Sequence, residues 1–107
     1  MTLEELLKYI KEESEHLIRK YQVHDPHLRR LARMAKLTEE VGELSSEVLA
    51  FDKLQNIRKL EKHTKETLAD EIADVTICTL LMAEACDVDV KKALTDKIAK
   101  IKARRQA

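Results

Sequence analysis

The stretch LADEIADVTICTLLMAEA, residues 68–85, decides the fold that the sequence predicts. It contains no glycine or proline, and Asp74 is the only charged residue between Ala73 and Ala83. A helix that is apolar on nearly every side is typical of one that neighbouring elements bury. We therefore predict a helix buried on most of its sides, with Thr64 as its N-cap.

The sequence before this stretch predicts two further helices. The 107 residues include one glycine and one proline, so most of the chain favours helix over turns. Thr2, with a glutamate three residues later, is typical of a capping box, and the first helix should run to about Tyr21. A longer second helix should begin at Asp25 and Pro26, a good N-cap followed by a residue suited to the first helical position. Its apolar stripe continues to Phe51.

The end of the chain predicts a fourth helix, capped by Asp89. Its apolar positions are expected to face inward: Val90, Leu94, Ile98 and Ile101. Residues 52–63 should form the connector before the buried helix, with a short amphipathic piece at Leu54, Ile57 and Leu60. We expect one domain, residues 1–107, with an all-α fold of the four-helix-bundle type. A body of this size has a thin core, which favours help from a partner subunit.

The overall composition argues against several classes of protein. The 20 basic and 20 acidic side chains cancel, which gives no electrostatic reason to bind a nucleic acid polymer or an anionic membrane. The sequence shows neither a signal peptide nor the run of roughly 20 apolar residues that crosses a bilayer. Cys78 and Cys86 lack the paired spacing of a metal or redox site. We expect a cytoplasmic protein with reduced thiols.

Two acidic motifs are spaced to share one site. Glu39, Glu40 and Glu43 lie in the long second helix, and Glu71 and Asp74 open the buried one. Residues three apart are neighbours on a helix surface, so each motif presents two carboxylates to one side. In an antiparallel hairpin that turns at the middle of the connector, Glu40 faces Asp74 and Glu43 faces Glu71. The sequence therefore predicts that these carboxylates meet.

Four converging carboxylates repel one another, which raises their pKa values or drives the helices apart. A divalent cation removes that repulsion, and Mg²⁺ prefers such hard oxygen ligands. Two alternatives stay open at this point. The acids of the second helix can form a solvated face, and lysine or arginine from another helix can pair with the cluster.

The sequence around both motifs resembles the MazG-like branch of the all-α nucleoside triphosphate pyrophosphohydrolases, whose signature is EExxE followed by ExxD. The similarity includes KLTEEVGELSSEV, residues 36–48, and LADEIADVTICTLLMAEACDVDVKKAL, residues 68–94, within a region from about Leu31 to Arg104. The resemblance implies a homodimer or homotetramer that releases a nucleoside monophosphate and pyrophosphate. It implies that Mg²⁺, or Mn²⁺ in its place, binds four residues: Glu40, Glu43, Glu71 and Asp74.

The resemblance also implies roles for residues outside the ligand set. Glu39 either supports the metal ligands or acts as the base that activates the attacking water. Lys97, Lys100 and Arg104 stand where the family often holds the triphosphate, although basic residues also suit a helix C-terminus by themselves. Near the turn before the second helix, three residues are placed either to contact a base or to pack between helices: Tyr21, His24 and His27.

Three functions follow from these expectations. The leading one is nucleotide-pool housecleaning, in which canonical or damaged (deoxy)nucleoside triphosphates are hydrolysed. The same superfamily includes phosphoribosyl-ATP pyrophosphohydrolase of histidine synthesis, which uses a similar arrangement of acids. The third is a helical dimer or adaptor without catalytic activity, in which the charged faces serve solubility and partner choice.

Overall fold

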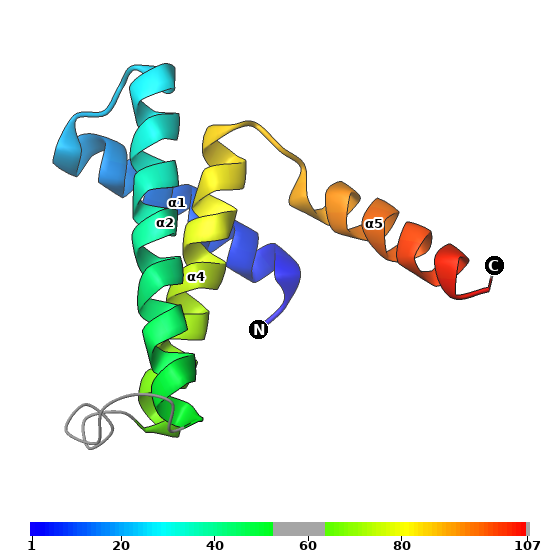
Figure 1. The fold of residues 1–107 in the computed structure, drawn as a ribbon. Helices are drawn as coiled ribbons and strands as arrows, with labels where there is room; N and C mark the ends of the chain where they lie inside the picture. Colours follow the sequence, from blue (N-terminus) through cyan, green and yellow to red (C-terminus); the bar gives the residue numbers. More distant parts are fainter. Residues whose placement is uncertain (53–63, 107) are drawn as a thin grey trace.

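The computed structural model describes residues 1–52 and 64–106, and all regular structure within them is helical (Figure 1). In chain order the helices are α1 (Leu3–Tyr21), α2 (Pro26–Phe51), α4 (Lys65–Ala85) and α5 (Val90–Arg105). The all-α prediction is confirmed. The short piece predicted around Leu54, Ile57 and Leu60 lies outside the described residues.

Each of these helices begins at a side chain that accepts a hydrogen bond from the backbone N–H three residues later. The pairs are Thr2 with Glu5 at 3.1 Å, Asp25 with Leu28 at 3.1 Å, Thr64 with Thr67 at 3.2 Å and Asp89 with Lys92 at 3.0 Å. Such caps satisfy backbone donors that have no partner inside the helix. All four predicted N-caps are therefore confirmed.

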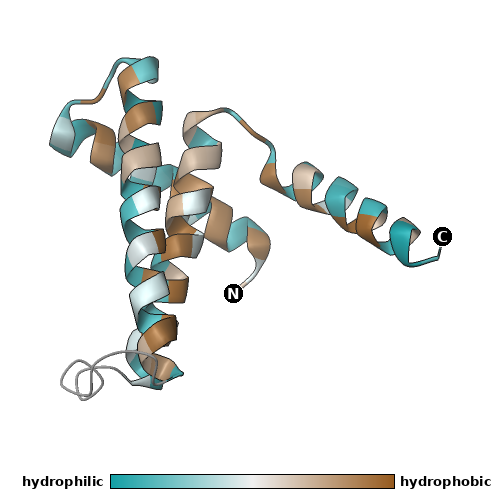
Figure 2. Cartoon of the chain, in the orientation of Figure 1, coloured by the Kyte–Doolittle hydropathy of each residue, from teal (hydrophilic) through white to brown (hydrophobic). Residues whose placement is uncertain are grey.

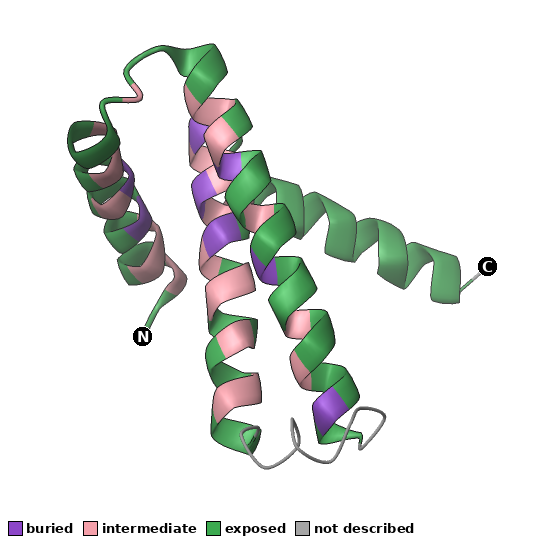
Figure 3. Cartoon of the chain, turned by 60° about the vertical axis from the view of Figure 1, so that its left-hand side comes forward, coloured by how far each residue is buried: buried purple, intermediate pink, exposed green. Residues whose placement is uncertain are grey.

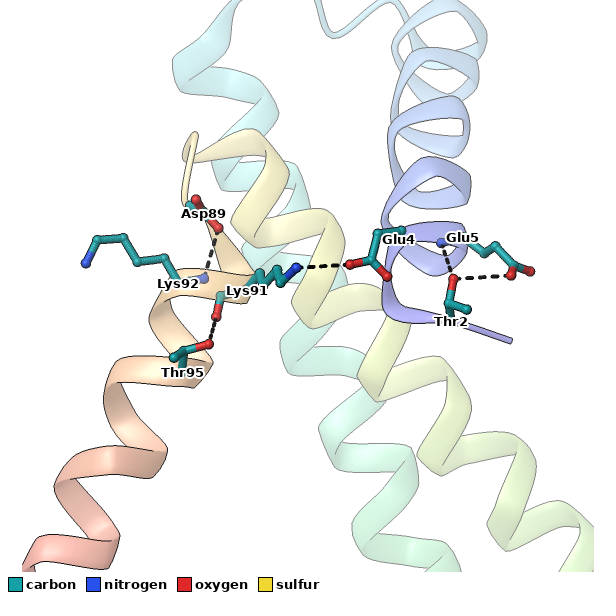
Figure 4. Close-up of polar contacts among 7 residues, drawn as sticks. All are labelled: Thr2, Glu4, Glu5, Asp89, Lys91, Lys92 and Thr95. Atoms are coloured by element: carbon teal, nitrogen blue, oxygen red, sulfur yellow. Dashed lines mark hydrogen bonds and ion pairs between the residues drawn. The ribbon is translucent and has the colours of Figure 1, made fainter.

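The capping box predicted at Thr2 takes a different form. The Thr2 hydroxyl donates to the Glu5 carboxylate at 3.2 Å (Figure 4). A reciprocal box occurs instead at the start of α4, where the Thr67 hydroxyl accepts from the Thr64 backbone N–H at 2.8 Å. A threonine thus takes the place that glutamate or glutamine usually fills.

Helices α2 and α4 lie side by side and antiparallel, and α1 packs against α4 (Figures 1 and 3). Where α1 meets α4, the fully buried Ser14 hydroxyl donates to the Glu84 carboxylate at 2.5 Å. At the other end of the hairpin the Thr67 hydroxyl donates to Glu47 at 2.9 Å. In an antiparallel hairpin, residues that face each other have residue numbers with a constant sum. Thr67 and Glu47 have the same sum as Asp74 and Glu40, so the predicted register is confirmed.

Helix α5 leads away from the hairpin and is exposed from Lys91 onward (Figures 1 and 3). Leu94 and Ile98 are each 50% exposed and Ile101 is 39% exposed. The prediction that the apolar residues of this helix face inward is therefore wrong for Leu94, Ile98 and Ile101 in the single chain, whereas Val90 at its start is half-buried. Asp87 adopts a left-handed conformation with φ of 55°, which turns the chain away from α4. The helices that the structure describes do not close the expected four-helix bundle within one chain.

The burial predicted for α4 is met only in part within the single chain, because one side of the helix is exposed. Its buried residues are Cys78, Leu81 and Ala85, whereas Ile72 is 50% exposed. Because α5 turns away, α1 and α2 are the only described helices that cover this helix extensively. Both α4 and α5 contain hydrophobic residues (Figure 2), and some of them, such as Ile72 and Leu94, are half-exposed. None of the helices described here is both long and apolar enough to span a membrane.

Replacing Ile10 with alanine should destabilise the chain strongly, because Ile10 is 2% exposed and belongs to the small core. We expect Ile10→Ala to lower the free energy of unfolding by about 2 to 5 kcal/mol, measured by urea denaturation. Ile98→Ala removes the same atoms from a half-exposed site and should lower it by less than about 1 kcal/mol. Equal losses in the two variants would contradict this assignment of the core.

Candidate metal centre

Glu40 is the buried member of the acidic cluster. Its position on α2 turns it toward α4, and the residue is 6% exposed. The Lys36 ammonium, one helical turn earlier, lies 3.0 Å from Oε1 and also 3.6 Å from Glu39. The other oxygen, Oε2, is buried and accepts no hydrogen bond from the described residues. One lysine therefore satisfies half of this carboxylate.

The two acids of α4 meet Glu40 across the hairpin. One carboxylate oxygen from each of Glu40, Glu71 and Asp74 lies within 4.8 Å of the other two. Glu71 and Asp74 are half-buried, and Glu71 Oε2 is a second buried oxygen with no hydrogen-bond partner among the described residues. Two carboxylate oxygens cannot hydrogen-bond to each other without a proton, so this arrangement requires a proton or a cation.

The acids of α2 form a second group around the same residue. Oxygens of Glu39, Glu40 and Glu43 also lie within 4.8 Å of one another, and Glu39 and Glu43 are exposed. Glu40 thus belongs to both groups and joins the two motifs. The structure brings together all five acids that the sequence singled out, with one buried, two half-buried and two exposed.

The charges of the cluster move its pKa values in opposite directions. Burial, assisted by the carboxylates of Glu40, Glu43 and Asp74, raises the pKa of Glu71 to about 7. Burial and the charge of Glu40 also raise the pKa of Asp74. The hydrogen bond from Lys36 lowers the pKa of Glu40, which keeps that group ionised. Repulsion is therefore relieved by a proton on Glu71 when no cation is present.

The donor set fits a small divalent cation. Mg²⁺ binds oxygen ligands at about 2.1 Å, so one ion bridges oxygens up to roughly 4.2 Å apart. The oxygens of Glu40, Glu71 and Asp74 lie within 4.8 Å of one another, so small side-chain rotations would suffice. Among the described residues the two groups consist of carboxylates alone, without a histidine or cysteine ligand, and such a donor set favours Mg²⁺ or Mn²⁺ over Zn²⁺.

The basic residues predicted to hold the triphosphate lie elsewhere. Lys97, Lys100 and Arg104 are exposed on α5, which extends away from the hairpin that carries the acids. The single chain therefore does not bring these cations to the cluster. Tyr21, at the end of α1, lines a cavity between α1, α2 and α4.

Two basic side chains near the cluster were missed in the sequence analysis. Arg33 is 8% exposed on α2, and Lys36 pairs with Glu40. The spacing of these two residues from Glu40 could have indicated that they lie on the same face of α2. Lys36 precedes Glu40 by four residues, and Arg33 precedes it by seven, which is two helical turns on the same face.

Comparison with known protein families found no match, and neither curated proteins nor solved structures gave one. The functional argument therefore depends on the residues and on their geometry. The resemblance of the two acidic motifs stays an expectation from sequence.

The pKa of Glu71 predicts a pH dependence of stability for the metal-free chain. Between its ordinary value of 4.5 and about 7, the folded state holds a proton that the unfolded state has released. The free energy of unfolding should therefore fall as pH rises through this window and level off above it. Thermal melts in a chelating buffer measure the slope.

Glu71→Gln should flatten that slope, because the amide carries no titrating proton. The control is Glu66→Gln, an exposed acid at the start of the same helix. A slope that is unchanged in Glu71→Gln would contradict the assignment of the raised pKa to this residue.

Proposed function

We propose that this protein is a Mg²⁺-dependent nucleoside triphosphate pyrophosphohydrolase, which converts a (deoxy)nucleoside triphosphate into the monophosphate and pyrophosphate. The observation that carries the proposal is the meeting of Glu40, Glu71 and Asp74, with two buried carboxylate oxygens left without a hydrogen-bond donor. The resemblance of the motifs to the MazG-like family supports the same reaction.

Each acid has a position suited to a role in this reaction. Glu40, Glu71 and Asp74 would hold the ion from the hairpin side, and Glu43 would approach from the exposed side. A bound Mg²⁺ orients the phosphates, offsets developing negative charge and acidifies a bound water. Glu39 is 59% exposed, so it can reach solvent and accept the proton of the water that attacks the α-phosphorus. The bond between the α-phosphorus and the bridging oxygen then breaks, and pyrophosphate leaves.

The surface of the single chain supports assembly into a homodimer or homotetramer. Ile72 on α4 and Leu94 and Ile98 on α5 are each half-exposed, and a second copy of the chain would cover such residues. Lys97, Lys100 and Arg104 can act on the triphosphate only if an assembly brings α5 to a cluster. Nucleotide-pool housecleaning in the cytoplasm is the cellular role that we propose for this activity.

Neutralising single ligands should abolish the reaction without unfolding the chain. Glu43→Gln and Asp74→Asn each remove a negative charge and conserve shape, so we expect Mg²⁺-dependent pyrophosphate release to fall at least about 100-fold. Glu66→Gln, an exposed acid of α4, should leave the rate unchanged. Circular dichroism checks that all three variants fold. Retained activity in both ligand variants would contradict the assignment.

Binding of Mg²⁺ should stabilise the folded chain by mass action. At a hundredfold excess over the dissociation constant, a ligand specific for the folded state adds about 2.7 kcal/mol. We expect a saturable rise in melting temperature with MgCl₂ that is lost in Asp74→Asn, whereas choline chloride at equal ionic strength gives no such rise. A flat Mg²⁺ titration would favour a helical adaptor without catalytic activity.

A further inference from the structure

A cavity of about 400 Å³ lies between α1, α2 and α4, next to the acidic cluster. Apolar side chains, among them Leu17, Val23 and Leu81, form much of its wall, and Tyr21 adds an aromatic ring. This volume falls in the range of small-molecule sites, in which apolar walls combine with a few fixed polar groups.

Arg33 supplies the main polar group of this cavity. The residue is 8% exposed, yet its Nε and Nη2 atoms have no hydrogen-bond partner among the described residues. These two atoms form the side edge of the guanidinium plane, with parallel N–H groups that match two neighbouring acceptors. Arginine stays charged in proteins, so this buried edge needs a partner.

The carboxylates near Arg33 do not fill that need. The negative charges of Glu84 and Glu13 favour the charged form of Arg33 and act to raise its pKa. Neither carboxylate, however, accepts a hydrogen bond from Nε or Nη2. Glu84 Oε2 is already the acceptor for Ser14. Glu13 lines the cavity and receives a 3.5 Å contact from the Tyr9 hydroxyl. The free edge of Arg33 is thus available to a ligand.

The cavity and the acidic cluster adjoin along both helices. Lys36 lines the cavity and lies 3.0 Å from Glu40. Cys78 also lines it, one turn beyond Asp74 on α4. Arg33 and Glu40 are two turns apart on α2, about 10 Å along the axis. This span is comparable to that between the edge of a base and the α-phosphate of a nucleotide.

We propose that the cavity holds the base of the nucleotide and that Arg33 selects bases with two adjacent acceptors on one edge. Guanine offers O6 with N7, and cytosine offers O2 with N3, whereas neither adenine nor uracil has two adjacent acceptors on one edge. Glu13, which lines the same cavity, can accept a hydrogen bond from the 4-amino group of cytosine, which is next to N3. The inference rests on the proposed function, since the cluster must hold the phosphates.

Two features favour a base over a phosphate as the occupant. The largely apolar wall would leave most oxygens of a phosphate without hydrogen bonds, which is costly for a charged group. The Tyr21 ring suits stacking on a planar base, as aromatic side chains do in nucleic acid sites.

The first arm of the test compares substrates with the wild-type protein. We expect kcat/KM for pyrophosphate release from GTP or CTP to exceed that from ATP and UTP by about 5- to 100-fold. The 7-deaza analogue of GTP lacks N7, and the 3-deaza analogue of CTP lacks N3. The analogue of the preferred substrate should lose most of the preference, mainly through a higher KM.

The second arm uses Arg33→Lys, which keeps the charge and removes the two-pronged edge. We expect the preference among the four bases to fall toward unity. Arg19→Lys, an exposed change on α1, should leave the preference intact. If Arg33→Lys fails to fold, the deaza analogues decide the question on the unaltered protein.

The outcomes separate this inference from the proposed function. Equal turnover of the four nucleotides, a preference for ATP or UTP, or full activity on the deaza analogue would overturn the inference alone. A preference that survives in folded Arg33→Lys would do the same. Absence of pyrophosphate release from every nucleotide with Mg²⁺ would overturn the proposed function, and this inference with it.

Discussion

The structure depends most on one buried carboxylate, that of Glu40, held between α2 and α4. A charge in this position must be compensated, and Lys36 reaches one of its oxygens. The second oxygen faces the acids of α4, where Glu71 Oε2 is also buried without a partner among the described residues. The part of the seam around Glu40 and Glu71 is therefore short of positive charge. A divalent cation would correct that shortage and tie the two acidic motifs into one centre.

The same seam divides into an acidic part and a basic part. Toward the connector the carboxylates of Glu71 and Asp74 gather around Glu40. Toward α1 the lining changes to Arg33 and apolar side chains, with Lys36 between the two regions. A triphosphate that is bound through a cation needs the first region, and an uncharged base needs the second. The proposed function would place the phosphates at the first region and the base at the second.

The features that were predicted correctly from the sequence are those that depend on residue type and local spacing. Caps follow from residue type at a helix start, and the hairpin register follows from two i, i+3 acid pairs placed symmetrically about the connector. The sequence did not predict which surfaces are covered, because an apolar stripe does not say what packs on it. Leu94 and Ile98 show this, since the left-handed turn at Asp87 sends α5 away from the bundle. Arg33 was missed because a single arginine in a charged helix is typical of a solvated face, although its spacing from Glu40 matched the buried side.

The most direct measurement is anomalous diffraction from crystals of the full chain grown with Mn²⁺. We expect a peak within coordination distance of the Glu40 and Glu71 carboxylates, with Asp74 and Glu43 turned toward it. A map with saturating Mn²⁺ that shows no peak there, and Glu40 and Glu71 still in direct contact, would contradict the central claim.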